Sequence, residues 1–185
     1  MEPHFQEIKN LRKFLNLSKY LPNIEPFWKN NDQICLNTTI GHPDDYTFGV
    51  GSLPVPDNLS DFPSKDEKIK ETTKYQHHLE SEFTEFNTQF INTPLEEIYY
   101  FIKMNFNVGR VRLMRIAPRK TMSWHFDTTQ RLHYPIETYT GCRMVIENES
   151  AHLPANTWWI TNTLNHHTAF NASDKYRIHI VACLL

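Results

Sequence analysis

Two histidines and one aspartate in the C-terminal half have the residue types and the spacing of a metal site. His125 and Asp127 are separated by one residue, and His167 follows forty residues after Asp127. Alternate residues of an extended segment share a side, so His125 and Asp127 can reach one metal from the end of a single strand. Two imidazoles and one carboxylate on one face are the ligand set of non-haem Fe(II) oxygenases, and they leave the opposite coordination positions open.

One arginine follows the candidate metal ligands closely in the sequence. Arg177 lies ten residues after His167, on what the pattern predicts to be the next strand. A guanidinium is always charged and can hold a carboxylate through two hydrogen bonds, so a buried Arg177 would require an anion. We expect it to bind a dicarboxylate cosubstrate; the alternative is a surface salt bridge to Asp174 or a glutamate. Together with the metal set, Arg177 predicts an oxygenase.

Neighbouring histidines leave the ligand set partly open. Either His166 or His167 could supply the third ligand, because only one of two consecutive strand residues faces the metal. We favour His167, since Phe170 would then pack away from the metal. A second His-x-Asp triplet starts at His42, but Pro43 cannot donate to a strand ladder and no matching histidine and arginine follow. We interpret that triplet as a solvated loop.

The composition limits the class of protein. The chain has 185 residues, of which 39% are hydrophobic and 13% aromatic, as expected for one globular domain. A net charge of -2 gives no reason to expect nucleic acid or an anionic membrane as a partner. No apolar run approaches the ~20 residues of a membrane span. Three widely spaced cysteines indicate reduced thiols and a cytoplasmic protein. The sequence does not indicate an oligomeric state.

The first hundred residues predict helices and loops. An apolar repeat predicts an amphipathic helix from Phe5 to about Tyr20. From 21 to 66, prolines and little periodicity predict loops and short extended pieces, with 41–66 either a lid over the metal or ordinary scaffold. Thr93 and Pro94 have the pattern of a helix start, and Gly109 is expected to end that helix.

After Gly109 the periodicity changes to that of strands. Polar and apolar residues alternate from Arg110 onward. Further strand-like runs cover 131–139, 142–147, 158–161, 167–171 and 176–184. Short strands at this spacing predict two packed antiparallel sheets of the jelly-roll, cupin-like kind. We therefore expect an all-β core with N-terminal helices (α+β) in a single domain, 1–185. Residues 1–108 would form the helical and loop scaffold with its possible lid, and 109–185 the core with the metal site.

Several motifs of this core match those of one family. They are Ala117-Pro118, Trp124-His125, the run from Arg131 to Ile136, the run from His167 to Asn171, and Arg177-Ile178-His179. With these, the stretch from Arg112 to Leu184 resembles the aspartyl/asparaginyl β-hydroxylase family of Fe(II)/2-oxoglutarate oxygenases. The resemblance does not extend to the first 90 residues.

The resemblance implies a double-stranded β-helix in which His125, Asp127 and His167 hold the iron. It also implies that Arg177 binds the distal carboxylate of 2-oxoglutarate, and that Arg131 and His133 lie near the other carboxylate and the substrate. Two positions depart from the family pattern: Arg119 stands where glycine is usual, and Met114 stands where some members have a small or hydroxyl residue.

The sequence thus predicts an Fe(II)- and 2-oxoglutarate-dependent dioxygenase that uses O2 to hydroxylate an unactivated C–H bond and releases succinate and CO2. The substrate would be an amino acid, a small acid, or an Asp/Asn-type side chain of a peptide or protein. Arg112 is a candidate substrate contact, with a solvated strand face as the alternative, and no catalytic side chain is predicted beyond the metal ligands. The competing hypotheses are a non-catalytic metal-binding jelly roll and a zinc hydrolase.

Overall fold

The computed structural model describes residues 3–29, 31–53 and 64–185. Its helices are α1 (Leu17–Trp28), α2 (Lys65–Ser81), the 3-10 turn η2 (Thr88–Phe90) and α3 (Pro94–Asn105). The first strands are β1 (Phe5–Ile8), β2 (Gln33–Cys35), β3 (Asn37–Thr38), β4 (Glu85–Phe86), β5 (Val108–Ile116) and β6 (Lys120–Thr121). The remaining strands are β7 (Arg131–Glu137), β8 (Cys142–Ile146), β9 (Glu149–Ala151), β10 (Trp158–Thr161), β11 (His167–Asn171) and β12 (Arg177–Leu184).

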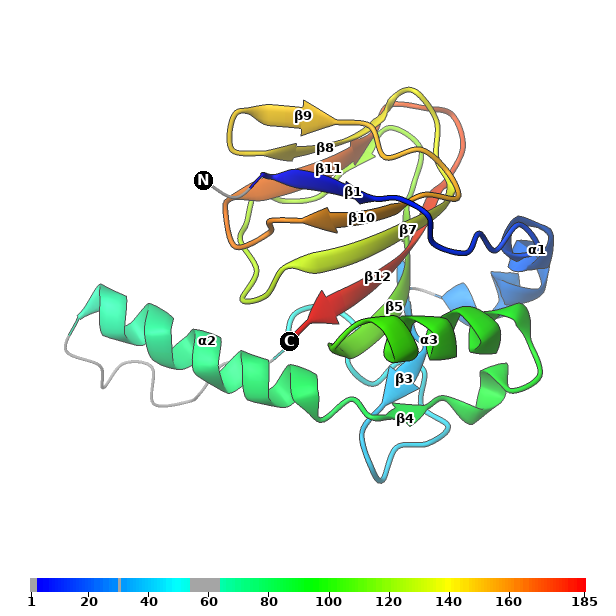
Figure 1. The fold of residues 1–185 in the computed structure, drawn as a ribbon, viewed down its shortest axis with the longest axis horizontal. Helices are drawn as coiled ribbons and strands as arrows, with labels where there is room; N and C mark the ends of the chain where they lie inside the picture. Colours follow the sequence, from blue (N-terminus) through cyan, green and yellow to red (C-terminus); the bar gives the residue numbers. More distant parts are fainter. Residues whose placement is uncertain (1–2, 30, 54–63) are drawn as a thin grey trace.

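Two antiparallel sheets form the body of the protein (Figure 1). Within the described residues, the larger sheet has the strand order β1-β10-β7-β12-β5-β2, and the smaller one has the order β6-β11-β8-β9. From β5 to β12, successive strands alternate between the two sheets except for the neighbours β8 and β9, which is the arrangement of a double-stranded β-helix. The predicted jelly-roll fold is therefore confirmed, and the strands predicted at 158–161 and 167–171 occur with those bounds.

The three central strands of the larger sheet have two different faces. One face packs against the helices and contributes to the main hydrophobic core, through residues of β5 (Val111, Leu113), β7 (Leu132, Tyr134, Ile136) and β12 (Ile178, Ile180, Ala182). Because strand side chains alternate, the neighbours of these residues point to the other face, between the two sheets. That inner face carries Arg110 and Arg112 of β5, Arg131 and His133 of β7, and Arg177 and His179 of β12, all of them buried.

The N-terminal segment departs from the prediction. Residues Phe5–Ile8 form strand β1, which pairs with β10 at the edge of the larger sheet, and the helix α1 begins only at Leu17. The expected helix from Phe5 to Tyr20 is therefore wrong. A four-residue run with apolar ends also fits a short strand, and pairing with β10 satisfies its backbone groups. The true amphipathic face of α1 is Leu17, Leu21, Ile24 and Trp28.

Helix α3 starts where predicted but ends earlier. The Thr93 hydroxyl accepts a hydrogen bond from the backbone N–H of Leu95, and Pro94 occupies the first turn. The helix ends at Asn105, so the prediction that Gly109 ends it is wrong. Gly109 instead lies in β5, where an added Cβ would be 2.2 Å from the carbonyl oxygen of Glu80. This glycine allows the end of α2 to approach the sheet.

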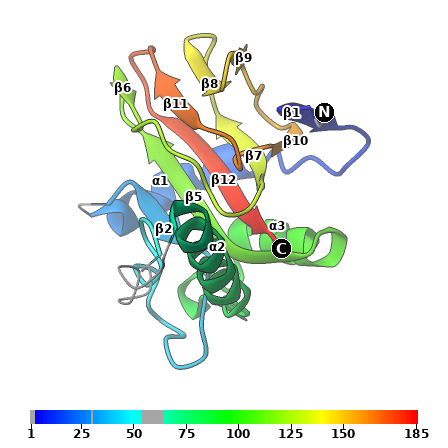
Figure 2. The ribbon, with the colours of Figure 1, turned by 90° about the vertical axis from the view of Figure 1, so that its left-hand side faces the viewer.

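The stretch expected as a lid is described only in part. Residues 41–53 form turns that reach the space between α2 and β5, whereas 54–63 lie outside the described residues. Figure 2 shows α2 in front of the sheet strands β5 and β12. None of the helices in the described part of the chain has the length and hydropathy of a membrane span. The three cysteines are buried and free.

Gly109→Ala should lower the free energy of unfolding by at least about 1–3 kcal/mol, because the new methyl group must displace the backbone at Glu80. Urea denaturation measures this change. Gly141→Ala is the matched control, since a Cβ there would be 3.2 Å from its nearest neighbour in Ala172. Equal stability of the two variants would contradict the close approach of α2 to β5.

Candidate functional site

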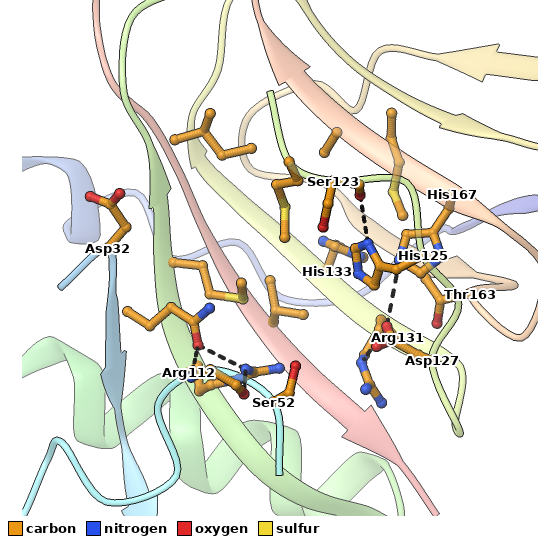
Figure 3. Close-up of a pocket in the computed structure, with 18 of the residues that line it drawn as sticks. Asp32, Ser52, Arg112, Ser123, His125, Asp127, Arg131, His133, Thr163 and His167 are labelled. Atoms are coloured by element: carbon orange, nitrogen blue, oxygen red, sulfur yellow. Dashed lines mark hydrogen bonds and ion pairs between the residues drawn. The ribbon is translucent and has the colours of Figure 1, made fainter. Parts of the chain in front are cut away.

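The three predicted metal ligands come together in the structure. One ligand atom from each of His125, Asp127 and His167 lies within 4.8 Å of the other two. The imidazole rings of His125 and His167 have centroids 4.4 Å apart, and Nε2 of His167 is 3.6 Å from Oδ2 of Asp127. Figure 3 shows the three side chains converging at one side of a pocket.

Backbone pairing positions these side chains. His125 and His167 exchange two backbone hydrogen bonds, of 3.1 and 2.7 Å, and Asp127 donates its N–H to the carbonyl of Thr163. Nδ1 of His125 lies 2.7 Å from the carbonyl oxygen of Ser123, and Nδ1 of His167 lies 3.0 Å from that of Asn165. Because a carbonyl only accepts, both Nδ1 atoms carry the proton and both Nε2 atoms remain free to bind a metal.

The structure also separates the alternatives among the histidines. His166 is exposed on the outside of the sheet, near Glu147, and stacks with Trp124, so it does not point toward Asp127. His167 is buried and faces the carboxylate. The other triplet is an exposed loop in which His42 stacks on Phe48 at 4.0 Å between ring centroids.

A cavity of about 630 Å³ joins the metal ligands to the inner face of the larger sheet. All seven residues predicted for the site line it: His125, Asp127, His167, Arg112, Arg131, His133 and Arg177. Helix α2 and the loop before it contribute further walls through Gln76, Glu80 and residues 51–53. In Figure 3, Arg112 and Ser52 lie on the opposite side of the pocket from His167. The cavity therefore has room for more than a metal ion.

A buried chain of charges connects α2 with the metal ligands. Glu80 forms two hydrogen bonds with Arg110, of 2.9 and 3.2 Å, and its Oε1 is 3.9 Å from Arg131. Arg131 in turn places its Nε 3.0 Å from Oδ2 of Asp127. Burial alone would lower the pKa of Arg131, but the anionic groups around it, Asp127 and Glu80 among them, outweigh this and raise it. Arg110 and Arg131 thus have carboxylate partners inside the protein.

Two further guanidiniums have no such partner. Among the described residues, no carboxylate lies within ion-pair distance of Arg112 or Arg177. Arg112 donates to the side-chain oxygen of Gln33 (2.8 Å) and the carbonyl of Gly51 (3.2 Å), and its Nε has no partner there. Arg177 is 4% exposed, and burial lowers its pKa to about 10. Buried cations without counterions are costly, so both indicate that the cavity accepts anions.

Two buried histidines complete the inner face. His133 lies in the cavity, and neither of its ring nitrogens has a hydrogen-bond partner among the described residues. His179 lies behind it, with ring centroids 5.8 Å apart in an edge-to-face arrangement. Burial, followed by the charge of Arg177, holds the pKa of both rings well below 6.5. A cavity residue with two unpaired nitrogens is suited to contact a polar ligand.

Sequence reasoning missed several residues of this cavity. Glu80 and Gln33 belong to segments with weak periodicity, and only the fold brings them to β5. Arg110 was visible beside the predicted Arg112 as one of several alternating arginines, but such alternation ordinarily indicates a solvated strand face. The signal that could have identified Arg110 is the density of arginines on this strand. Arg115 of the same strand lies on the other face of the sheet, between Trp28 and Tyr176.

The comparison with protein families decides the relationship. The model of the aspartyl/asparaginyl β-hydroxylase family matches residues 69–184. The chain belongs to this family. The matched range includes every predicted site residue and also Gln76 and Glu80, so it extends beyond the stretch from Arg112 that the motifs indicated. A search among curated proteins found no match.

Solved structures resemble the chain only distantly. A viral collagen prolyl hydroxylase from Paramecium Bursaria Chlorella virus-1 is 10% identical over 98% of this chain and 94% of its own, with a TM-score of 0.48. A 2OG-Fe(II) oxygenase family protein from Burkholderia pseudomallei is 11% identical over 54% of this chain and 60% of its own, with a TM-score of 0.46. A cupin domain from Bordetella pertussis is 15% identical over 41% of this chain and 80% of its own, with a TM-score of 0.37. We draw no functional argument from these likenesses.

The two departures from the family pattern differ in their consequences. Arg119 adopts a φ of 55°, the left-handed conformation that a glycine takes without strain, and its side chain is exposed. This turn therefore adopts the left-handed conformation without a glycine. Met114 pairs in register with His179, whereas Ile116 pairs with Arg177. The side chains of Met114 and Ile116 both line the cavity, so the wall that β5 forms near Arg177 is apolar.

The donor set fits a divalent transition metal, since two neutral imidazole nitrogens and one carboxylate oxygen converge from one side. Arg177, which has no carboxylate partner among the described residues, and the two free nitrogens of His133 fit an anionic, hydrogen-bonding ligand beside that metal. The cavity can thus hold a metal and at least one carboxylate together.

Asp127→Ala should weaken Fe(II) binding by at least about 100-fold, because loss of a direct ligand costs more than loss of a supporting hydrogen bond. Anaerobic calorimetric titration measures the affinity. Asp44→Ala, in the other His-x-Asp triplet, is the matched control and should bind as the wild type does. Unchanged affinity in Asp127→Ala would place the metal elsewhere.

Stability should depend on pH through the two buried histidines. His133 and His179 stay neutral when folded, but they take up protons at about 6.5 when unfolded. The unfolded state therefore binds more protons below that pH, and the free energy of unfolding should fall as pH drops from about 6.5. The slope should approach about 1.4 kcal/mol per pH unit for each histidine.

Urea denaturation of the metal-free protein between pH 7.5 and 5.5 measures this slope. His179→Asn should reduce the slope by up to about 1.4 kcal/mol per pH unit, because one buried histidine is removed. A free energy of unfolding that is constant over this range would show that the two rings are not buried in neutral form.

Proposed function

We propose that this protein is an Fe(II)- and 2-oxoglutarate-dependent dioxygenase. It would hydroxylate an unactivated C–H bond of an amino acid, a small acid, or an Asp/Asn-type side chain of a protein, with release of succinate and CO2. The observation that carries this proposal is that the buried Arg177, which has no carboxylate partner among the described residues, lies in the same cavity as His125, Asp127 and His167. Membership of the β-hydroxylase family supports it.

His125, Asp127 and His167 would hold the iron on one face, with the two Nδ1–H groups bound to backbone carbonyls so that the rings keep their orientation. Bound iron and 2-oxoglutarate supply the oxidative chemistry, in which the keto acid loses CO2 and one oxygen atom is transferred to the substrate. The protein contributes position, charge and exclusion of water.

Arg177 would bind the distal carboxylate of 2-oxoglutarate, and Arg131 and His133 would lie near the other carboxylate. Nε of Arg131 lies 3.0 Å from Oδ2 of Asp127, so Arg131 can contact a group bound next to that carboxylate. His133 has both ring nitrogens free inside the cavity. A ligand there would satisfy polar atoms that are otherwise buried without partners.

Arg112 would contact the substrate. Its guanidinium is fixed by Gln33 and Gly51 on the side of the cavity away from His167, and its charge is not balanced by a carboxylate in the described residues. Because Arg177 would bind the cosubstrate, the positive charge of Arg112 would remain available for an acidic group of the substrate. This favours substrates that carry a carboxylate.

The two competing hypotheses, a non-catalytic metal-binding jelly roll and a zinc hydrolase, do not account for the buried arginines of the cavity. A metal-binding jelly roll without turnover has no need of a buried arginine beside the metal. A zinc hydrolase needs a general base near the metal. Glu80 is the buried cavity carboxylate other than Asp127 in the described residues, but both of its oxygens are bound to Arg110.

Turnover under ¹⁸O₂ tests the proposal. Fe(II)-loaded protein with 2-oxoglutarate and candidate amino acids, small acids and Asp- or Asn-containing peptides should yield succinate containing one ¹⁸O atom. A true substrate should gain the other ¹⁸O atom. Arg177→Ala should raise the KM for 2-oxoglutarate roughly 10- to 100-fold through loss of charged hydrogen bonds. Iron-loaded protein that forms no succinate with any of these candidates would contradict the proposal, and metal-dependent hydrolysis would favour a hydrolase.

A further inference from the structure

Arg177 is hydrogen-bonded to His179, which lies on the same face of the sheet but does not line the cavity. We propose that His179 is a positioning residue that orients the guanidinium of Arg177 for the distal carboxylate of 2-oxoglutarate. This inference rests on the proposed function, because it assigns a role within the same cosubstrate site. It makes the cavity's preference for a dicarboxylate depend on a buried imidazole that would not touch the cosubstrate.

The contact between the two residues defines their chemistry. Nη2 of Arg177 and Nδ1 of His179 are 3.0 Å apart. A guanidinium has only N–H donors, so Nδ1 must accept and the ring proton must be on Nε2. The two residues are two positions apart on β12 and therefore point to the same face of the sheet. His179 thus acts as a neutral acceptor beside a permanent cation.

The surroundings keep this acceptor in place. His179 is 1% exposed and lies in register with Met114 of β5 on one side and Pro135 of β7 on the other. The ring of His133 packs against it edge to face. Burial and the nearby charge of Arg177 keep the pKa of His179 well below 6.5, so the ring remains unprotonated at neutral pH. Arg177 lines the cavity, whereas His179 does not.

The energetic consequence follows from the freedom of a long side chain. Arg177 has no carboxylate partner among the described residues, so without His179 its guanidinium would lose its one observed side-chain hydrogen bond. A carboxylate that binds a mobile arginine must also immobilise it, which lowers affinity. A guanidinium already held in one orientation avoids that cost. The benefit is confined to ligands whose carboxylate reaches Arg177.

Two amide variants separate this role from general damage to the core. The carbonyl oxygen of Asn can occupy the place of Nδ1, whereas that of Gln reaches the place of Nε2. His179→Asn should therefore keep the acceptor for Arg177, and His179→Gln should lose it. Both variants bring a polar amide of similar character into the same buried position, so each controls for the other.

The measurement is anaerobic titration of the Fe(II)-loaded proteins with 2-oxoglutarate and, separately, with pyruvate, which has the keto acid group but no distal carboxylate. The wild type should prefer 2-oxoglutarate. His179→Gln should lose roughly 10- to 100-fold in affinity for 2-oxoglutarate with little change for pyruvate, as expected for loss of a hydrogen bond to a charged group. His179→Asn should retain most of the preference.

Other outcomes overturn the inference in distinguishable ways. If His179→Gln binds 2-oxoglutarate as tightly as the wild type does, or loses affinity for both acids equally, His179 does not position Arg177 and the proposed function still stands. If the iron-loaded wild type binds neither acid, the proposed function itself fails, and the role of His179 fails with it.

Discussion

Four buried arginines on the inner face of one sheet are the constraint on which the rest of the structure depends. Arg110, Arg112, Arg131 and Arg177 face the space between the sheets, and in the described residues they meet two buried or half-buried carboxylates, Glu80 and Asp127. Burying a charge is costly unless it is paired. Anionic ligands in the cavity would supply the negative charge that these residues do not.

The fold tolerates this concentration of charge because the other face of the same strands is apolar. Residues of β5, β7 and β12 that alternate with the arginines pack against α1 and α3 in the main core, which includes the fully buried Tyr134 and Trp158. Helix α2 adds the charge of Glu80, and the absence of a side chain at Gly109 lets it approach closely enough to do so. The larger sheet thus carries both the buried arginines and the helix packing, while His167 faces them from β11 of the smaller sheet.

The sequence was sufficient for the features that depend on local patterns. The strand period, the helix start at Thr93 and the closeness of His125 to Asp127 could be predicted, since each depends on spacing along the chain. His167 was predicted from its place on a later strand and from the motifs shared with the family. The strand at Phe5 could not be predicted, because four residues do not distinguish a strand from a helix turn until β10 is beside them. Nor could Glu80 and Gln33, whose partners Arg110 and Arg112 are supplied by tertiary contacts.

The most direct test of the oxygenase proposal is the anaerobic titration of Fe(II)-loaded protein with 2-oxoglutarate, followed by the weak visible absorption band of a keto acid bound to iron. The band should appear in the wild type and in Arg143→Ala, because Arg143 lies on β8 and bonds to Ser150 outside the cavity. At matched concentration the band should be lost in Arg177→Ala. Intact iron binding with no band in the wild type at any concentration of 2-oxoglutarate would contradict the proposal.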